Sequence, residues 1–247
     1  MTDTTGPASP ALSSAHRRLF ILTICAGSFL LFLVQPMIAR MALPRLGGAP
    51  TVWNSAMLVY QALLLGGYAY AHWLGRFAPR RQGQIHLALF VLAAVMLPIG
   101  LSAATPPVDA SPVIWVPWLL LSSIGPLFFV VSAQAPLMQR WFANSGGGDP
   151  YRLYAASNLG SFAGLIAYPL LVEPTLPLGS QSWLWTAGYA MLFALVAGCA
   201  LILPRAVSAQ LQPEQGGGKG GSFIYWTVLA AIPSGLMLST TLYLTTD

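Results

Sequence analysis

The sequence predicts an all-α protein: a polytopic transmembrane bundle of about seven helices, built as a 3+3 inverted repeat plus a seventh helix. Three observations predict this fold. Only 7% of the 247 residues are charged and 56% are hydrophobic, whereas a soluble domain carries roughly 25% charged residues. Seven apolar runs are each long enough to cross a bilayer core, which takes about 20 helical residues. The sequence also matches itself when it is shifted by 100 positions.

The N-terminal 18 residues are rich in Ser, Thr, Pro and Ala, and we expect them to form a disordered cytoplasmic tail. A basic cluster, Arg17 and Arg18, precedes the first apolar run. A secretory signal is the alternative interpretation of this arrangement. The apolar stretch is too long for one, and no small-residue cleavage site follows it. We therefore expect a retained first helix.

The apolar runs cover positions 19–38, 53–74, 84–103, 113–135, 153–172, 183–203 and 223–244. Proline and glycine interrupt several of them, which membrane helices tolerate because neighbouring groups satisfy the freed carbonyls. A cytoplasmic linker rich in Gln, Gly and Ser occupies 204–222. The expected organisation is a six-helix bundle at 19–203, with repeats 19–103 and 113–203. We expect the last segment, 223–247, to begin a truncated second half.

The basic residues predict the orientation of the bundle. With a cytoplasmic N-terminus, all Lys and Arg residues except Arg40 and Arg45 lie on the inner side, as the positive-inside rule requires. Asp247 then falls on the outer side. The net charge of +5 is explained by topology, so it does not indicate a nucleic-acid partner. The low charge content likewise excludes an ordinary soluble enzyme.

The shift by 100 positions aligns identical residues between 28–70 and 128–170. The pairs are Phe29/Phe129, Pro36/Pro136, Arg40/Arg140, Gly47/Gly147, Gly48/Gly148, Pro50/Pro150, Ala56/Ala156, Leu65/Leu165 and Tyr68/Tyr168. Because three is an odd number of helices, the second copy enters the membrane from the opposite side. Such inverted repeats build many secondary transporters, including each half of the major facilitator (MFS) fold. A shared apolar composition is the alternative source of the match.

Two arginines are gating candidates, because the repeat would exchange them. Arg40 follows Pro36 at the outer end of the first helix, and Arg140 follows Pro136 at the inner end of the fourth. The alternative is that both are ordinary interfacial arginines after a proline kink.

Polar side chains within the spans are the candidates for a substrate path, because polar groups at membrane depth face cavities or one another. They are Gln35, Asn54, Gln61, Gln134, Ser157, Asn158 and Glu173. We expect Gln35 and Glu173 to line an outer vestibule with Arg40 and Arg45. Hydrogen bonding between helices is the alternative role for this set.

Other residues favour packing or interfacial roles. Gly160 and Gly164 permit a close helix crossing. His72 and His86 are expected at the cytoplasmic interface. Cys25 and Cys199 lack metal-ligand spacing. No metal site, cofactor or catalytic residue is expected in this chain.

Several stretches are similar to the membrane region of bacterial fused MFS/spermidine synthases, from about residue 18 onwards. They are 32–40, 46–54, 60–72, 149–158, 172–174 and 238–247. The resemblance implies a multi-pass protein of the bacterial inner membrane. Many members of that family carry a spermidine-synthase-like domain downstream, but no catalytic residue of such a domain can be assigned here.

Three functions are compatible with these observations. The first is a transporter-like membrane domain that moves a small solute. The second is a non-catalytic membrane anchor of a synthase-like enzyme, and the third is an accessory subunit of a larger membrane complex. The expected partners are the lipid bilayer and either a second copy in a homodimer or a larger assembly, and no nucleic acid.

Overall fold

A computed structural model describes residues 12–105 and 111–204, together with seven separate positions between 225 and 240. The chain divides into two units, 1–207 and 208–247. Most of the expected linker lies outside the described residues. The expected seventh span, 223–244, is described only at the separate positions Tyr225, Val228, Leu229, Ile232, Leu236, Ser239 and Thr240, each of which is helical.

The first helix, α1 (Ser14–Leu46), is longer than the apolar run that predicts it. Ser13 caps its start, because its side-chain oxygen accepts a hydrogen bond from the His16 amide at 3.3 Å. The helix ends at Gly47, whose φ of 71° is unfavourable for residues with a Cβ. Residues 14–18, assigned to the tail from the sequence, therefore belong to the helix.

The second helix, α2 (Pro50–Leu74), matches its prediction, but the third does not. Helix α3 (Pro79–Ala93) and a 3₁₀ turn (Ala94–Met96) end well before position 103. Leu97 is extended because it precedes Pro98, and proline disfavours a helical conformation in the residue before it. The predicted third span is therefore too long, and its last part is a non-helical connection.

The remaining helices contain two irregularities. The fourth predicted span forms α4 (Pro112–Ser132) and α5 (Gln134–Asn144), with a break at Ala133. The fifth forms α6 (Tyr151–Ala167), a π-helical turn (Tyr168–Val172) and the short α7 (Glu173–Thr175). Pro169 lies in the π turn, where its missing N–H interrupts the regular ladder. The sixth span is α8 (Leu178–Ile202).

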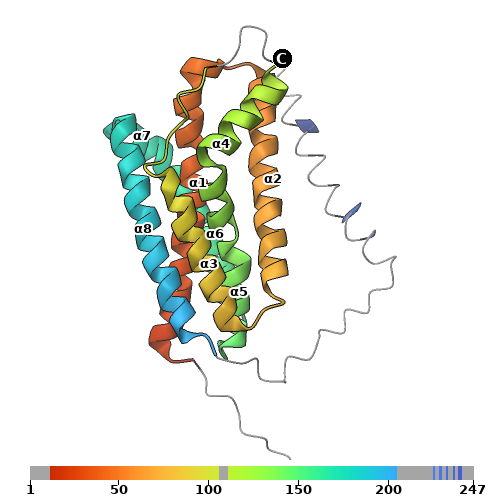
Figure 1. Ribbon diagram of the computed structural model, residues 1–247, viewed down its shortest axis with the longest axis vertical. Coiled ribbons are helices and arrows are strands. Elements are labelled where there is room, and N and C mark those ends of the chain that lie inside the picture. The colour runs from red at the N-terminus through yellow and green to blue at the C-terminus, as the bar shows by residue number, and fades with distance from the viewer. Residues whose placement is uncertain are drawn as a thin grey trace, which may run out of the picture. The chain divides into compact units, whose positions relative to one another are not determined.

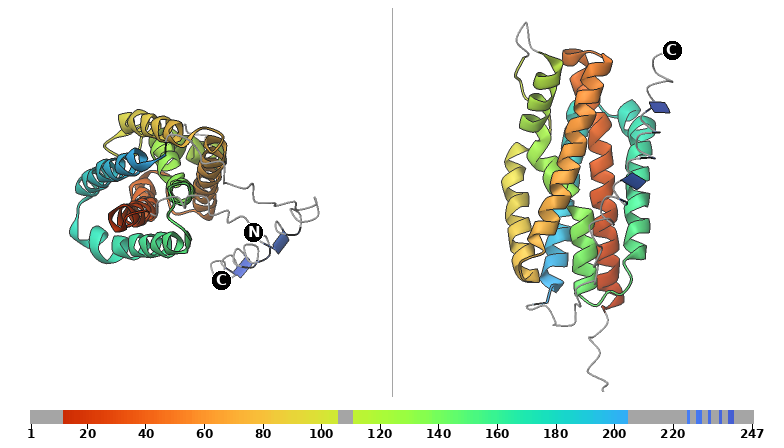
Figure 2. Two further views of the ribbon diagram at one scale, coloured as in Figure 1. Left: turned by 90° about the horizontal axis from the view of Figure 1, so that it is seen from below. Right: turned by 90° about the vertical axis from the view of Figure 1, so that its right-hand side faces the viewer.

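The helices of residues 12–204 form one bundle with α1 and α4 at its centre (Figures 1 and 2). Helix α1 packs against α6 and α8, and α2 packs against α4. Helices α1, α3 and α6 run in one direction, whereas α2, α4 and α8 run in the other (Figure 1). The two successive triplets therefore traverse the bundle in opposite senses. Strands are absent from the described residues.

Glycine determines how closely α1 and α6 approach. A Cβ at Gly160 would overlap the Cys25 carbonyl, and one at Gly164 would overlap the Phe29 carbonyl. The predicted close crossing is confirmed at both glycines. Four helical segments are long and apolar enough to cross a membrane: Ser14–Leu46, Pro112–Asn144, Tyr151–Thr175 and Leu178–Ile202. Helices α2 and α3 do not meet that measure among the described residues.

Candidate functional site

Two of the residues expected at an outer vestibule, Arg40 and Glu173, lie together where α1 approaches α7. The Arg40 guanidinium lies 3.3 Å from the Glu173 carboxylate. The same Nη1 atom donates a hydrogen bond to the Glu173 backbone carbonyl at 3.1 Å. Gln35 does not join them, since its amide donates to Leu31 of its own helix at 3.4 Å. Arg40 therefore contacts both the side chain and the backbone carbonyl of the first residue of α7.

Arg45, which was expected to line the same vestibule, contacts a different segment. Its guanidinium donates to the Ser102 carbonyl in the connection after α3. Ser123 of α4 holds the same connection, because its hydroxyl accepts a hydrogen bond from the Ser102 amide at 2.9 Å. Arg45 thus attaches the end of α1 to the non-helical segment that replaces the last part of the predicted third span.

Arg140 lies at the opposite end of the bundle, against the end of α2. Its Nη1 donates to the Ala71 carbonyl at 3.3 Å. A Cβ at Gly75 would overlap the guanidinium, so the absence of a side chain at Gly75 provides the space for it. Both gating candidates therefore donate to a backbone carbonyl near the carboxyl end of a helical segment, where a cation interacts favourably with the helix dipole.

The two arginines make corresponding contacts. Arg40, in the first helix of the first triplet, reaches the carboxyl end of the second helix of the other triplet. Arg140, in the first segment of the second triplet, reaches the carboxyl end of α2, the second helix of the first triplet. Subtracting the 100-residue shift from Glu173 gives position 73, which is two residues from the observed acceptor Ala71. If the two triplets were superposed by the 100-residue shift, the Arg40–Glu173 contact would therefore fall close to the Arg140–Ala71 contact.

A buried polar cluster occupies the space between α2, α3 and α5. The Gln134 side chain lies 3.0 Å from His86 Nε2, and the Tyr70 hydroxyl lies 3.4 Å from His86 Nδ1. His86 is fully buried within the bundle, and its expected position at the cytoplasmic interface stays a prediction. Helix α3 begins at Pro79, before the apolar run, and the turn carrying His86 packs inside the bundle.

Gln82 and Trp141 extend the same cluster. The Trp141 indole donates to Gln82 Oε1 at 2.9 Å, and the Gln82 amide donates to the Phe77 carbonyl at 2.8 Å. Gln82 was not among the candidates chosen from the sequence. Its spacing of four residues from His86, which places both on one helix face, is the signal that could have found it.

The other path candidates do not converge. Ser157 pairs with Ser28 across the α1–α6 contact at 2.8 Å, which is the hydrogen bonding between helices that was the alternative. Asn54, Gln61 and Asn158 are exposed on the outer surfaces of α2 and α6. The seven candidates therefore fall into an ion pair, a buried cluster, a helix–helix contact, an exposed surface and, for Gln35, a bond within its own helix.

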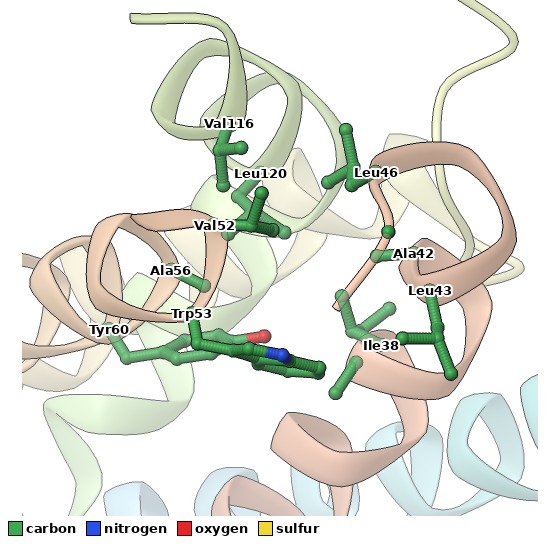
Figure 3. A pocket seen from close by; sticks show the side chains of 12 residues that line it. Ile38, Ala42, Leu43, Leu46, Val52, Trp53, Ala56, Tyr60, Val116 and Leu120 are labelled. Atoms are coloured by element: carbon green, nitrogen blue, oxygen red, sulfur yellow. The ribbon is translucent and has the colours of Figure 1, made fainter. Parts of the chain in front are cut away.

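Two hollows among the described residues are lined by mostly apolar side chains. One, a small hollow of about 20 Å³, lies between the end of α1 and the starts of α2 and α4. Trp53 and Tyr60 supply the polar side-chain atoms among the labelled residues around it (Figure 3). The other is larger and lies between α1, the π turn and α8. Neither is lined by any of the seven path candidates.

Within the described residues, His, Cys, Asp and Glu form no group that could hold a metal ion. Cys199 is buried with its sulfur 3.3 Å from the Thr23 hydroxyl. No protein-family model, curated protein or solved structure matches this chain. The function must therefore be argued from the residues themselves.

Proposed function

We propose that this chain is a transporter-like domain of the bacterial inner membrane, similar to the N-terminal part of fused MFS/spermidine synthases, and that it moves a small solute. The observation that carries the proposal is the pair of corresponding arginine contacts. Arg40 binds the Glu173 carbonyl at one end of the bundle, and Arg140 binds the Ala71 carbonyl at the other. Contacts of this kind are expected when two triplets are related by a two-fold axis in the membrane plane.

The direction of the helices supports the same proposal. The two triplets run in opposite senses (Figure 1), as an inverted repeat requires. In alternating access, one end of a bundle closes while the other opens. Arg40 and Arg140 each attach the first helix of one triplet to the second helix of the other, so breaking either contact would free one end. We therefore keep both arginines as gating residues.

The distribution of basic residues supports a cytoplasmic N-terminus. Among the described residues, seven arginines lie at or near the end where α1 begins and α2 ends: Arg17, Arg18, Arg76, Arg80, Arg81, Arg140 and Arg152. Arg40 and Arg45 belong to the other end of α1. This asymmetry is what the positive-inside rule produces.

Uptake into proteoliposomes tests the proposal. Purified full-length chain would be reconstituted and screened with labelled polyamines and other small organic cations, because the resemblance suggests that substrate class. We expect saturable uptake that Arg40→Ala and Arg140→Ala slow. Gly179→Ala is the matched control, because a Cβ there meets no atom within 4 Å. Uptake no faster than that of empty liposomes would contradict transport of this class.

A non-catalytic anchor or accessory subunit is the second candidate. The observation that favours it is the apolar lining of both hollows and the absence of every path candidate from them. We then expect no uptake and stable co-purification, in mild detergent, with a soluble synthase-like enzyme or with other membrane proteins. Purification of the chain without such a partner would count against this candidate.

A further inference from the structure

The surface of α2 that faces away from α4 carries an unusual pattern. Six residues follow one another at alternating intervals of four and three positions: Asn54, Leu58, Gln61, Leu65, Tyr68 and His72. All six are exposed, and Leu58 and Leu65 are 65% and 71% exposed. Alternating intervals of four and three positions are those of the seam by which two helices pack in a left-handed coiled coil. We call these six residues the α2 seam.

The opposite side of α2 already has a partner. Val52, Ala56, Val59, Gly67 and Ala71 are buried, and this side packs against α4. Helix α2 lies at the edge of the bundle (Figure 2). The α2 seam is therefore not needed for packing among residues 12–204, although it has the periodicity of a packing surface.

The seam is long enough to span a membrane. Asn54 and His72 are 18 positions apart, which is about 27 Å at 1.5 Å per residue, close to the roughly 30 Å of the hydrocarbon core. Gln61 lies between them at mid-depth. Within the described residues, neither Asn54 nor Gln61 makes a side-chain hydrogen bond. Lipid tails cannot supply one, so a free amide at this depth is costly.

We propose that the α2 seam is the interface of a parallel homodimer. Two copies inserted in one membrane have the same orientation, so a two-fold axis along the membrane normal brings the two α2 helices together in register. Gln61 of one copy then contacts Gln61 of the other, and the two Asn54 side chains likewise contact each other. A carboxamide both donates and accepts, so it is complementary to itself. The leucines pack between the amides, and exposed Ala62 and Ala69 beside the seam permit a close approach.

The proposal does not depend on transport, and its first test does not measure uptake. Single cysteines would be introduced at Leu58, Gln61 and Leu65 in full-length protein that carries Cys25→Ala and Cys199→Ala. The control cysteines would replace Leu159 and Phe162 of α6, which are 64% and 63% exposed. We expect oxidation in native membranes to form disulfide-linked dimers at the seam positions and few at the controls.

Several results would overturn the homodimer. One is equal cross-linking at the seam and at α6. Another is no cross-linking at any seam position. A third is cross-linking of the seam to a different protein, which would make the occupant another membrane helix rather than a second copy.

A second measurement tests the role of the amide. Gln61→Leu removes the self-complementary group from an exposed position, so the fold of the monomer is expected to persist, as helical circular dichroism would verify. In liposomes, energy transfer between labelled copies should show a dimer dissociation constant about 3- to 30-fold higher, the fold-change of one interhelical hydrogen bond. Gln61→Asn should retain dimerisation. Asn158→Leu, on the exposed side of α6, should leave it unchanged. An unchanged dissociation constant for Gln61→Leu would contradict the proposed pairing.

Discussion

Arg140 occupies the space that a side chain at position 75 would fill. Its guanidinium lies where a Cβ of Gly75 would stand, and from there it donates to the Ala71 carbonyl at 3.3 Å. The contact joins α5 to the end of α2 over a separation of 69 residues. The sequence had singled out Arg140 as a gating candidate, but it had not indicated that Gly75 lies against it.

Gly75→Ala should displace the Arg140 side chain and break its bond to Ala71. The guanidinium is the mobile end of a long side chain, so we expect the cost to be that of the lost hydrogen bond, about 1–3 kcal/mol for a charged donor. Thermal unfolding in detergent would measure it. The control is a double-mutant cycle: in Arg140→Ala protein, Gly75→Ala should cost much less. Equal costs in both backgrounds would show that the two residues are not coupled.

Gly160→Ala and Gly164→Ala should separate α1 from α6. The atoms that the new methyl groups would overlap are the backbone carbonyls of Cys25 and Phe29, which cannot move without their helix. We expect each variant to lose about 1–3 kcal/mol, as for other overpacked sites. Gly179→Ala should unfold like the unsubstituted protein. A stability loss no larger than that of Gly179→Ala would mean that α1 and α6 can move apart at this crossing with little cost in free energy.

Removing one member of the His86–Gln134 pair should be more harmful than replacing both. Gln134 is only 2% exposed, so His86→Phe leaves a buried amide without its partner, at about 1–3 kcal/mol. His86→Phe with Gln134→Leu removes both polar groups and should recover much of that loss. Denaturant unfolding of the three variants would show the recovery. Additive losses would place the two residues in independent environments.

Arg40→Ala should destabilise the protein more than Glu173→Gln. The side chains of the ion pair are 40% and 43% exposed, so water and salt screen their attraction, and such pairs contribute about 0–1 kcal/mol. Glu173→Gln keeps the backbone carbonyl that accepts from Arg40 at 3.1 Å, whereas Arg40→Ala loses both contacts. Unfolding at low and high salt would separate them, because only the ion pair weakens with salt. A larger loss for Glu173→Gln would indicate that the carboxylate has a second role.

The helical segments were largely predictable, because apolar runs and their flanking turn residues act locally. The runs predict α1, α2, α4 and α8, and the close crossing at Gly160 and Gly164 is confirmed. The third segment was too long because hydropathy does not register how Pro98 forces Leu97 out of the helix. The breaks at Ala133 and in the π turn were also missed. The inverted relation of the triplets as a transporter repeat stays a prediction.

By itself, the sequence determined that this chain is helical, that it suits a lipid environment, and where most helices lie. These properties depend on the composition and spacing of neighbouring residues, which hydropathy reports directly. Only the tertiary structure decided several partners of the polar residues: Arg45 with Ser102, Gln134 with His86. Those pairs depend on how each helix is rotated about its axis and on where it bends. Rotation is set by packing against helices that are distant in the sequence, so residues equal in polarity, such as Gln134 and Gln61, occupy a buried core and an exposed surface.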